Sequence, residues 1–268
     1  MPTPIFLDTR TADLATAKGH TADAASAAVD NLLTDRRSEF ARSSGDVTTF
    51  FCNFELDVST TINAMALFDV IGPLTVETKV QFRGASSEAN LTASPTFDST
   101  ATIIPVTADG VRHAVWYSET GYSVAFVRVD VTFTGTAQVL GASRVMFGGA
   151  WAPERKVQYG SGLVTPGSRT EVIETDSGGQ FLRHLSRRRA AEPGLVLTED
   201  EYGDDIWEIY AYAGTNRPLM YCQDASVWQS DPEYASKQLL YGRIVDTGMV
   251  TAEGYDYHVV SIPLEEYT

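Results

Sequence analysis

The hydrophobic pattern of the chain changes near residue 47, where small and mixed residues give way to a two-residue alternation. Between Phe50 and Val58 the even positions are apolar, with Asn53, Glu55 and Asp57 between them. Because successive side chains of a strand point to opposite faces, this alternation predicts a half-buried β-strand. The same reasoning predicts further strands at Ile62–Phe68, Leu74–Arg83, Thr102–Val106, Ala114–Tyr117, Tyr122–Phe133 and Ser143–Gly148.

The segments between these strands carry residues typical of turns and loops. Glu119-Thr120-Gly121 predicts a turn, and the polar stretch from Gly84 to Thr100, which contains a proline, predicts an exposed loop. Short strands separated in this way are typical of a β-sandwich. The sequence therefore predicts a mainly β protein whose first domain covers residues 1–150.

A second, smaller β-rich domain is predicted for residues 151–268, after a stretch rich in Gly, Pro and Trp. The segment 176–179, Asp-Ser-Gly-Gly, predicts a hairpin turn between strands at 169–175 and 180–186. Thr198 and Glu201 have the spacing of a capping box, which predicts one α-helix at 199–212, with Gly214 as its stop. Further strands are predicted at 219–222, 238–246 and 255–263. The buried stripe of the helix is predicted to contain Tyr202, Ile206, Ile209, Tyr210 and Ala213.

Charge and hydropathy narrow the range of partners. The net charge of −15 repels phosphate backbones, so no nucleic-acid partner is expected for the chain as a whole. The one basic stretch, Arg183–Arg189, is interpreted as a strand end or as a face that pairs with acidic groups. The first residues lack the pattern of a signal peptide, and no apolar run approaches membrane-spanning length. We therefore expect synthesis in the cytoplasm and no membrane insertion.

The residues that carry chemistry do not form a recognisable constellation. The four histidines are isolated, and no Gly-x-Ser-x-Gly motif is present. The two cysteines, Cys52 and Cys222, lie far apart, and Cys52 is predicted to be a buried free thiol. The acidic cluster Glu199–Asp205 is interpreted as charge at a helix N-terminus, with Ca²⁺ binding as the alternative. The prediction is a protein that is not an enzyme, with no catalytic residues, no cofactor and no metal site.

The order of motifs in residues 8–150 resembles that of discoidin-like domains. Asn31–Asp35 resembles the family's asparagine–leucine–acid turn, and Phe54–Val58 resembles its apolar strand ending in an aspartate turn. The segments Ile62–Phe68, Val76–Arg83 and Tyr122–Phe133 resemble its following strands. The resemblance implies a jelly-roll β-sandwich that binds and carries no chemistry of its own. Phe40 replaces the family's tryptophan, so ligand specificity does not carry over.

The order of motifs along the whole chain resembles that of minor tail proteins of tailed bacteriophages. The resemblance implies a structural protein of the phage tail tip, in the distal-tail region of the virion. It also implies a homo-oligomeric ring that links the tail tube to host-facing tail proteins. The residues that carry the resemblance are Val145–Gly148, Trp151–Pro153, Ser177–Gly179, Glu199–Trp207, Pro218–Leu219, Tyr241–Arg243 and Leu264–Glu266.

Carbohydrate binding is the alternative function. Loops at the rim of a jelly roll can offer aromatic side chains to the sugars of a host surface glycan. Trp116, Tyr117 and Tyr122 lie near a predicted turn and are the candidate residues. The same three side chains could instead pack against a neighbouring subunit, because interfaces are rich in Tyr and Trp.

Overall fold

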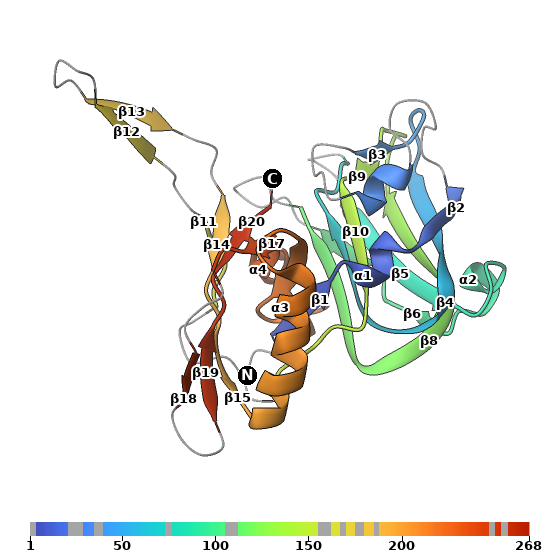
Figure 1. The fold of residues 1–268 in the computed structure, drawn as a ribbon. Coiled ribbons are helices and arrows are strands. Elements are labelled where there is room, and N and C mark those ends of the chain that lie inside the picture. The colour runs from blue at the N-terminus through green and yellow to red at the C-terminus, as the bar shows by residue number, and fades with distance from the viewer. Residues whose placement is uncertain are drawn as a thin grey trace.

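The computed structural model describes residues 4–20, 29–34, 40–72, 77–104, 112–154, 162–166, 170–174, 180–184, 188–246, 250–252 and 257–267. The protein is mainly β, with an N-terminal jelly-roll β-sandwich packed beside a second β-rich body (Figure 1). The elements of the first body are α1 (Arg10–Asp13), β2 (Thr16–His20), η1 (Val29–Leu33), β3 (Ala41–Arg42), β4 (Thr49–Phe68), β5 (Thr78–Ala85), α2 (Asn90–Ala93), β6 (Phe97–Asp98), β7 (Thr102–Ile104), β8 (Ala114–Phe133), β9 (Gly141–Ala142) and β10 (Arg144–Gly148).

Two long antiparallel strands, β4 and β8, form the framework of the sandwich. Their pairing shifts register twice, and both strands curve strongly (Figure 1). The first half of β4 pairs with β2, and its last residues pair with β10. Phe54 and Phe147, from the two ends of this arrangement, face each other with their ring centroids 5.6 Å apart. Bulges thus let the same two strands contribute to opposite walls of one core.

These bulges account for two predictions that were wrong. Glu119-Thr120-Gly121 forms no chain-reversing turn, because β8 continues through it as the pairing moves from Ile62↔Tyr122 to Ala64↔Tyr117. Val58 does not share the buried face of its strand and is 70% exposed, because it lies in the other register shift.

Among the other predictions for the first body, the buried face of β8 and the buried Cys52 thiol are confirmed, and the loop after Gly84 is wrong. Val127, Val129, Val131 and Phe133 are buried as the alternation predicts, and Cys52 is a buried free thiol. The stretch predicted as a loop from Gly84 to Thr100 contains helix α2 and strand β6 instead. Leu91 and Phe97, which are buried there, supply the apolar anchors that hold these elements to the sandwich. Residues 74–76 of the predicted strand at Leu74–Arg83 lie outside the described residues.

The second body contains the predicted helix. Thr198 and Glu201 form the predicted capping box: the backbone N–H of Thr198 donates to Glu201 Oε2 at 3.0 Å, and the N–H of Glu201 donates to Thr198 Oγ1 at 3.3 Å. The helix begins with the π-helical segment η2 (Glu201–Ile206), continues as α3 (Trp207–Ala213), and stops at Gly214 with φ of 50°. The predicted stripe packs on the second core.

The strands of the second body are partly those predicted, and one helix was not expected. Helix α4 (Pro232–Gln238) is capped by Asp231, whose side chain accepts from the Tyr234 N–H at 2.9 Å. The other elements are β1 (Ile5–Asp8), β11 (Thr165–Pro166), β12 (Thr170–Glu174), β13 (Gln180–His184), β14 (Arg189–Ala191), β15 (Gly194–Leu197), β16 (Pro218–Cys222), η3 (Ala225–Val227), β17 (Leu239–Ile244), β18 (Val250–Ala252), β19 (His258–Ser261) and β20 (Leu264–Glu266).

The predicted hairpin is present as a separate two-stranded unit. β12 and β13 pair in an antiparallel manner from Thr170↔His184 to Glu174↔Gln180. The unit extends away from both bodies (Figure 1). The turn predicted at 176–179 lies outside the described residues.

Three strands form a wall that both cores share. Along β16, Met220 and Cys222 belong to the core of the jelly roll, while Leu219 and Tyr221 belong to the core under α3. β17 and β1 divide their side chains in the same way, because a strand covered on both faces needs apolar residues at every position. The ring centroids of Phe68 and Tyr241 lie 5.2 Å apart across the contact between the bodies.

The first strand of the chain belongs to the second body. β1 pairs with β16 from Ile5↔Cys222 to Asp8↔Leu219, so the chain crosses from one body to the other at α1. The division of the chain into residues 1–150 and 151–268 stays a prediction. The structure adds that β1, the first strand of the chain, pairs with a strand of the second body.

Candidate ligand-binding site

The predicted site residues Trp116 and Tyr122 lie together in an aromatic cluster with Phe97. The rings of Phe97 and Trp116 stack at 4.4 Å with an interplanar angle of 6°, and Tyr122 lies 6.1 Å from Trp116. Trp116 is only 8% exposed, so its ring faces are used for packing. Tyr117 and Tyr122 are half-buried and keep some exposed surface. A ligand or interface role for the three residues stays a prediction, and it would have to act through the two tyrosines.

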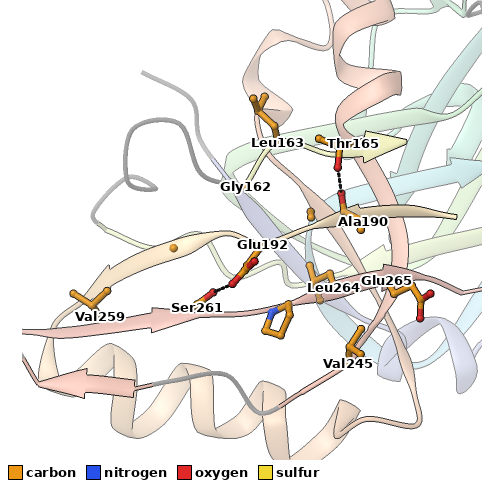
Figure 2. A pocket seen from close by; sticks show the side chains of 13 residues that line it. Gly162, Leu163, Thr165, Ala190, Glu192, Val245, Val259, Ser261, Leu264 and Glu265 are labelled. Atoms are coloured by element: carbon orange, nitrogen blue, oxygen red, sulfur yellow. Dashed lines mark hydrogen bonds between the residues drawn. The ribbon is translucent and has the colours of Figure 1, made fainter. Parts of the chain in front are cut away.

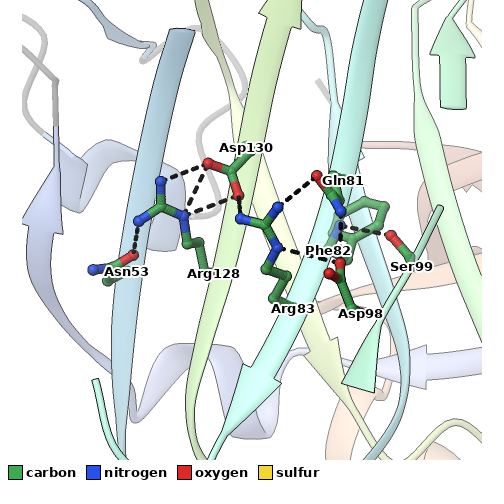
Figure 3. Close-up of polar contacts among 8 residues, drawn as sticks. All are labelled: Asn53, Gln81, Phe82, Arg83, Asp98, Ser99, Arg128 and Asp130. Carbon is green, nitrogen blue, oxygen red and sulfur yellow. Dashed lines mark hydrogen bonds and ion pairs between the residues drawn. The ribbon is translucent and has the colours of Figure 1, made fainter. Parts of the chain in front are cut away.

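A network of polar side chains crosses the outer face of the β4–β8–β5 sheet (Figure 3). Its centre is Asp130, which is almost buried and accepts from Arg128 at 2.7 Å and from Arg83 at 3.0 Å. Arg83 also donates to Gln81 and Asp98, and Arg128 lies over the Phe51 ring at 4.0 Å. The network satisfies its own donors and acceptors, so we interpret it as a clamp between strands.

A groove of about 830 Å³ lies on the second body, bordered by β11, β14, β19 and β20 (Figure 2). Leu163 and Val245, which line it, are 45% and 50% exposed. Its polar contacts are few: Ser261 donates to Glu192 at 2.8 Å, and Thr165 to the Ala190 carbonyl at 3.4 Å. This groove offers an apolar surface with few polar groups.

A second hollow of about 470 Å³, which we call the Trp151 hollow, lies where the two bodies meet. Its walls come from the end of β1, the start of α1, the segment after β10, and the helix η2–α3. Trp151 is half-buried and is fixed by two backbone hydrogen bonds of 2.9 Å with Phe6, whose ring lies 5.4 Å from its own. The residues that line it are Phe6, Asp8, Arg10, Thr11, Gly149, Ala150, Trp151, Asp205, Glu208 and Ile209.

The charged groups of the Trp151 hollow differ in how far they are neutralised. Asp8 Oδ2 accepts from Arg10 Nη2 at 2.8 Å and from Arg10 Nε at 3.1 Å, and Asp8 Oδ1 accepts from the Arg10 backbone N–H at 2.9 Å. The Arg10 guanidinium also lies over the Tyr212 ring. Partial burial raises the pKa of Asp205, a hydrogen bond from the Trp151 side chain lowers it, and the nearby charges of Glu201, Asp204 and Glu208 raise it further. The net direction is upward, so added negative charge is unfavourable at this position.

A smaller hollow of about 120 Å³ adjoins the Trp151 hollow and shares Arg10 and Thr11 with it. Two exposed apolar residues, Leu14 and Val58, line it. The two hollows therefore adjoin at the start of α1.

The sequence did not indicate the Trp151 hollow. Asp205 and Glu208 carry a local signal, since residues three apart share a face of a helix, but their cluster was interpreted as helix N-terminal charge. Glu201 fits that interpretation, because it is buried and accepts from the backbone N–H groups of Thr198 and Glu154. Asp8, Arg10 and Trp151 reach the hollow only through the pairing of β1 with β16, which no local pattern reveals.

Two arginines at the end of the basic stretch Arg183–Arg189 lie among the described residues. Arg188 lies 3.4 Å from Glu265, and the almost buried Arg189 lies 3.2 Å from Glu266. Arg189 Nη2 is also 2.7 Å from Nε2 of the buried His113, which ties β14 to the start of β8. These two arginines therefore pair with acidic groups of the same chain. Residues 185–187 lie outside the described residues.

Among the described residues, no group of three or more His, Cys, Asp or Glu side chains is placed to hold a metal ion. In that part of the chain, none of the helices has both the length and the apolar character that crossing a bilayer requires.

Comparison with known proteins gives similarity to solved structures only. No family model and no curated protein matches the chain. A carbohydrate-binding module, CBM32-3 from a family 31 glycoside hydrolase of Clostridium perfringens, is 12% identical with a TM-score of 0.39, over 54% of this chain and 94% of that one. A fucolectin from Morone saxatilis (striped bass) serum is 17% identical with a TM-score of 0.40, over 65% and 57%. A pectin-binding module is 14% identical with a TM-score of 0.37, over 50% and 88%. At this level the similarity assigns no ligand to the chain.

Proposed function

We propose that the protein binds carbohydrate at the Trp151 hollow and does so without a chemical step. The observation that carries the proposal is one half-buried indole beside the side chains of Asp8, Arg10, Asp205 and Glu208 in a single hollow. Ligand sites commonly combine an aromatic or apolar wall with a few polar groups that fix orientation. A sugar ring matches this arrangement, because its C–H face packs on an aromatic ring and its hydroxyls bond to carboxylates and guanidinium groups.

Binding to immobilised glycans tests the proposal. Trp151→Ala should abolish binding to every glycan to which the unchanged protein binds. Trp207→Ala is the matched control, because Trp207 is a 67% exposed tryptophan on α3, the helix that borders the hollow, and does not itself line the hollow. Retention of binding by Trp151→Ala, with its circular dichroism unchanged, would refute the location. Release of reducing ends from a bound polysaccharide would refute the absence of a chemical step.

A role in the tail tip of a phage virion is the second candidate, and the projecting β12–β13 hairpin favours it (Figure 1). A two-stranded hairpin alone is at best marginally stable in water, and this one carries Val172, Ile173, Phe181 and Leu182. Packing against a neighbouring subunit or tail protein would stabilise it. The same candidate places the protein in the virion, in a ring of its own copies.

Removal of the hairpin tests this second candidate. Pro166 and Arg189 are paired neighbours at its base, so a short Gly-containing turn can replace residues 167–188. The shortened chain should remain folded and lose self-association in sedimentation experiments. An antibody to the intact chain should label the distal end of tails in electron micrographs. Label on the head, or none on virions, would contradict the tail-tip role.

A further inference from the structure

We propose that the Trp151 hollow takes an ammonium-bearing ligand, namely a chain of amino sugars with free amines. The inference rests on the proposed carbohydrate-binding function and adds to it the charge of the sugar. It follows from the distribution of charge in the hollow, from the indole that lines it, and from the smaller hollow that adjoins it.

The helix carboxylates that line the hollow carry negative charge that no ion pair among the described residues neutralises. The Arg10 guanidinium already forms an ion pair with Asp8 Oδ2, so this pair contributes little net charge. Among the described residues, neither Asp205 nor Glu208 has an ion-pair partner, and Glu201 and Asp204 add further negative charge nearby. An acidic sugar would bring like charge into this hollow, whereas an ammonium group would neutralise it.

The hollow also has an aromatic wall. Trp151 and Asp205 both line the hollow, and the indole is close enough to the carboxyl group to lower its pKa, so the two groups lie near each other. A cation placed against Asp205 would therefore also lie near the electron-rich face of the indole, and Trp gives the strongest such attraction among aromatic residues. A neutral sugar would use the ring face but would leave the two carboxylates without a counter-charge.

A second, smaller hollow adjoins the Trp151 hollow. The Trp151 hollow continues over Arg10 and Thr11 into the smaller hollow with Leu14 and Val58. Two adjoining hollows fit successive residues of a linear chain better than a single terminal sugar. The ligand class is thus an oligomer of glucosamine type, bound along its length.

The test compares linear tetrasaccharides of glucosamine, N-acetylglucosamine and galacturonic acid by titration calorimetry at about pH 6, where primary amines are protonated and ordinary carboxylates are ionised. We expect the glucosamine oligomer to bind most tightly and the galacturonic acid oligomer least. Asp205→Asn and Glu208→Gln should each weaken binding of the glucosamine oligomer on the order of tenfold and weaken binding of the N-acetylated oligomer less, because the neutral sugar loses hydrogen bonds but no ion pair. Glu199→Gln, an acidic residue at the start of the same helix that does not line the hollow, should change neither.

The outcomes separate this inference from the function on which it rests. If none of the three oligomers binds and glycan arrays are also silent, carbohydrate binding itself fails. If the neutral or acidic oligomer binds best, or if Asp205→Asn and Glu208→Gln are without effect, the charge inference is wrong while the carbohydrate-binding function stands. A poly-lysine peptide that binds more tightly than the glucosamine oligomer would also overturn it, because the hollow would then be a site for basic protein.

Discussion

Gly84 on β5 is the position at which one added methyl group should disturb the aromatic cluster that contains Trp116. A Cβ at this position would lie 2.8 Å from Cδ1 and Cζ of Phe97 and closer still to Cε1. Phe97 cannot withdraw without losing its parallel stack on Trp116, whose ring lies 4.4 Å away. The Gly84→Ala substitution should therefore force Phe97 out of its present position.

The size of the effect follows from three contributions. Insertion of a methyl group into a packed region costs about 1–3 kcal/mol, and loss of an aromatic pair costs about 0.5–1.5 kcal/mol more. Replacement of glycine by alanine restricts the unfolded chain and returns about 0.4–1 kcal/mol. We expect a net loss of about 2 kcal/mol of unfolding free energy, and a chain of this size loses about 2–4 °C in Tm for each kcal/mol.

Thermal unfolding followed by near-ultraviolet circular dichroism measures both consequences, since the signal of Trp116 should change together with Tm. Gly203→Ala is the control, because a Cβ there meets nothing within 4 Å and alanine favours the helix. Phe97→Leu should cost less in the Gly84→Ala background than in the unchanged protein. A Gly84→Ala variant with unchanged Tm and spectrum, or strict additivity of the two substitutions, would refute the reasoning.

Three further predictions concern the second body and the cysteines. Thr198→Ala removes the cap of the helix and should lower the unfolding free energy by about 1 kcal/mol in urea titrations; an unchanged midpoint would show that the π-helical start needs no cap. Burial raises the pKa of the Cys52 thiol and raises that of Cys222 to about 12, so neither should react with a thiol reagent until the protein is denatured; rapid labelling of the native protein would contradict their burial. Burial raises the pKa of Tyr210 from 10.0 to about 12, so its contribution to stability is intact below about pH 10 and is lost as the pH rises to about 12. Tyr210→Phe should reduce this alkaline loss, and an identical pH profile in both proteins would contradict the assignment.

The elements that could be predicted from the sequence are those determined by neighbouring residues. The valines of β8 alternate with Arg128 and Asp130, and the structure buries the valines and leaves the charged residues on the other face. The capping box of Thr198 and Glu201 spans only three residues, so its hydrogen bonds form wherever the helix packs. Helix α4 carries a similar local signal, Asp231 followed by Pro232, but its apolar pattern is too short to distinguish a helix from a loop.

The features that could not be predicted depend on contacts between distant segments. A turn sequence such as Glu119-Thr120-Gly121 is compatible with a bulge as well as with a reversal, and pairing with β4 decides between them. The apolar runs of β1, β16 and β17 indicate strands buried on both faces, but they do not say which strands lie side by side. The ring of Trp116 makes it a candidate ligand residue in the sequence, whereas its stacking partner Phe97 lies in a segment that the sequence predicts to be a loop.

The position of the Trp151 hollow follows from one of these distant contacts. β1 pairs with β16 in the second body, and this pairing brings Asp8 and Arg10 to the face of the helix that carries Asp205 and Glu208. Trp151 reaches the same place because its backbone bonds to Phe6 on β1. A fragment cut at residue 150 would keep the jelly-roll strands but lose Trp151, both carboxylates of the helix and the partner strand of β1. The proposed binding site therefore belongs to the contact between the two bodies and requires both.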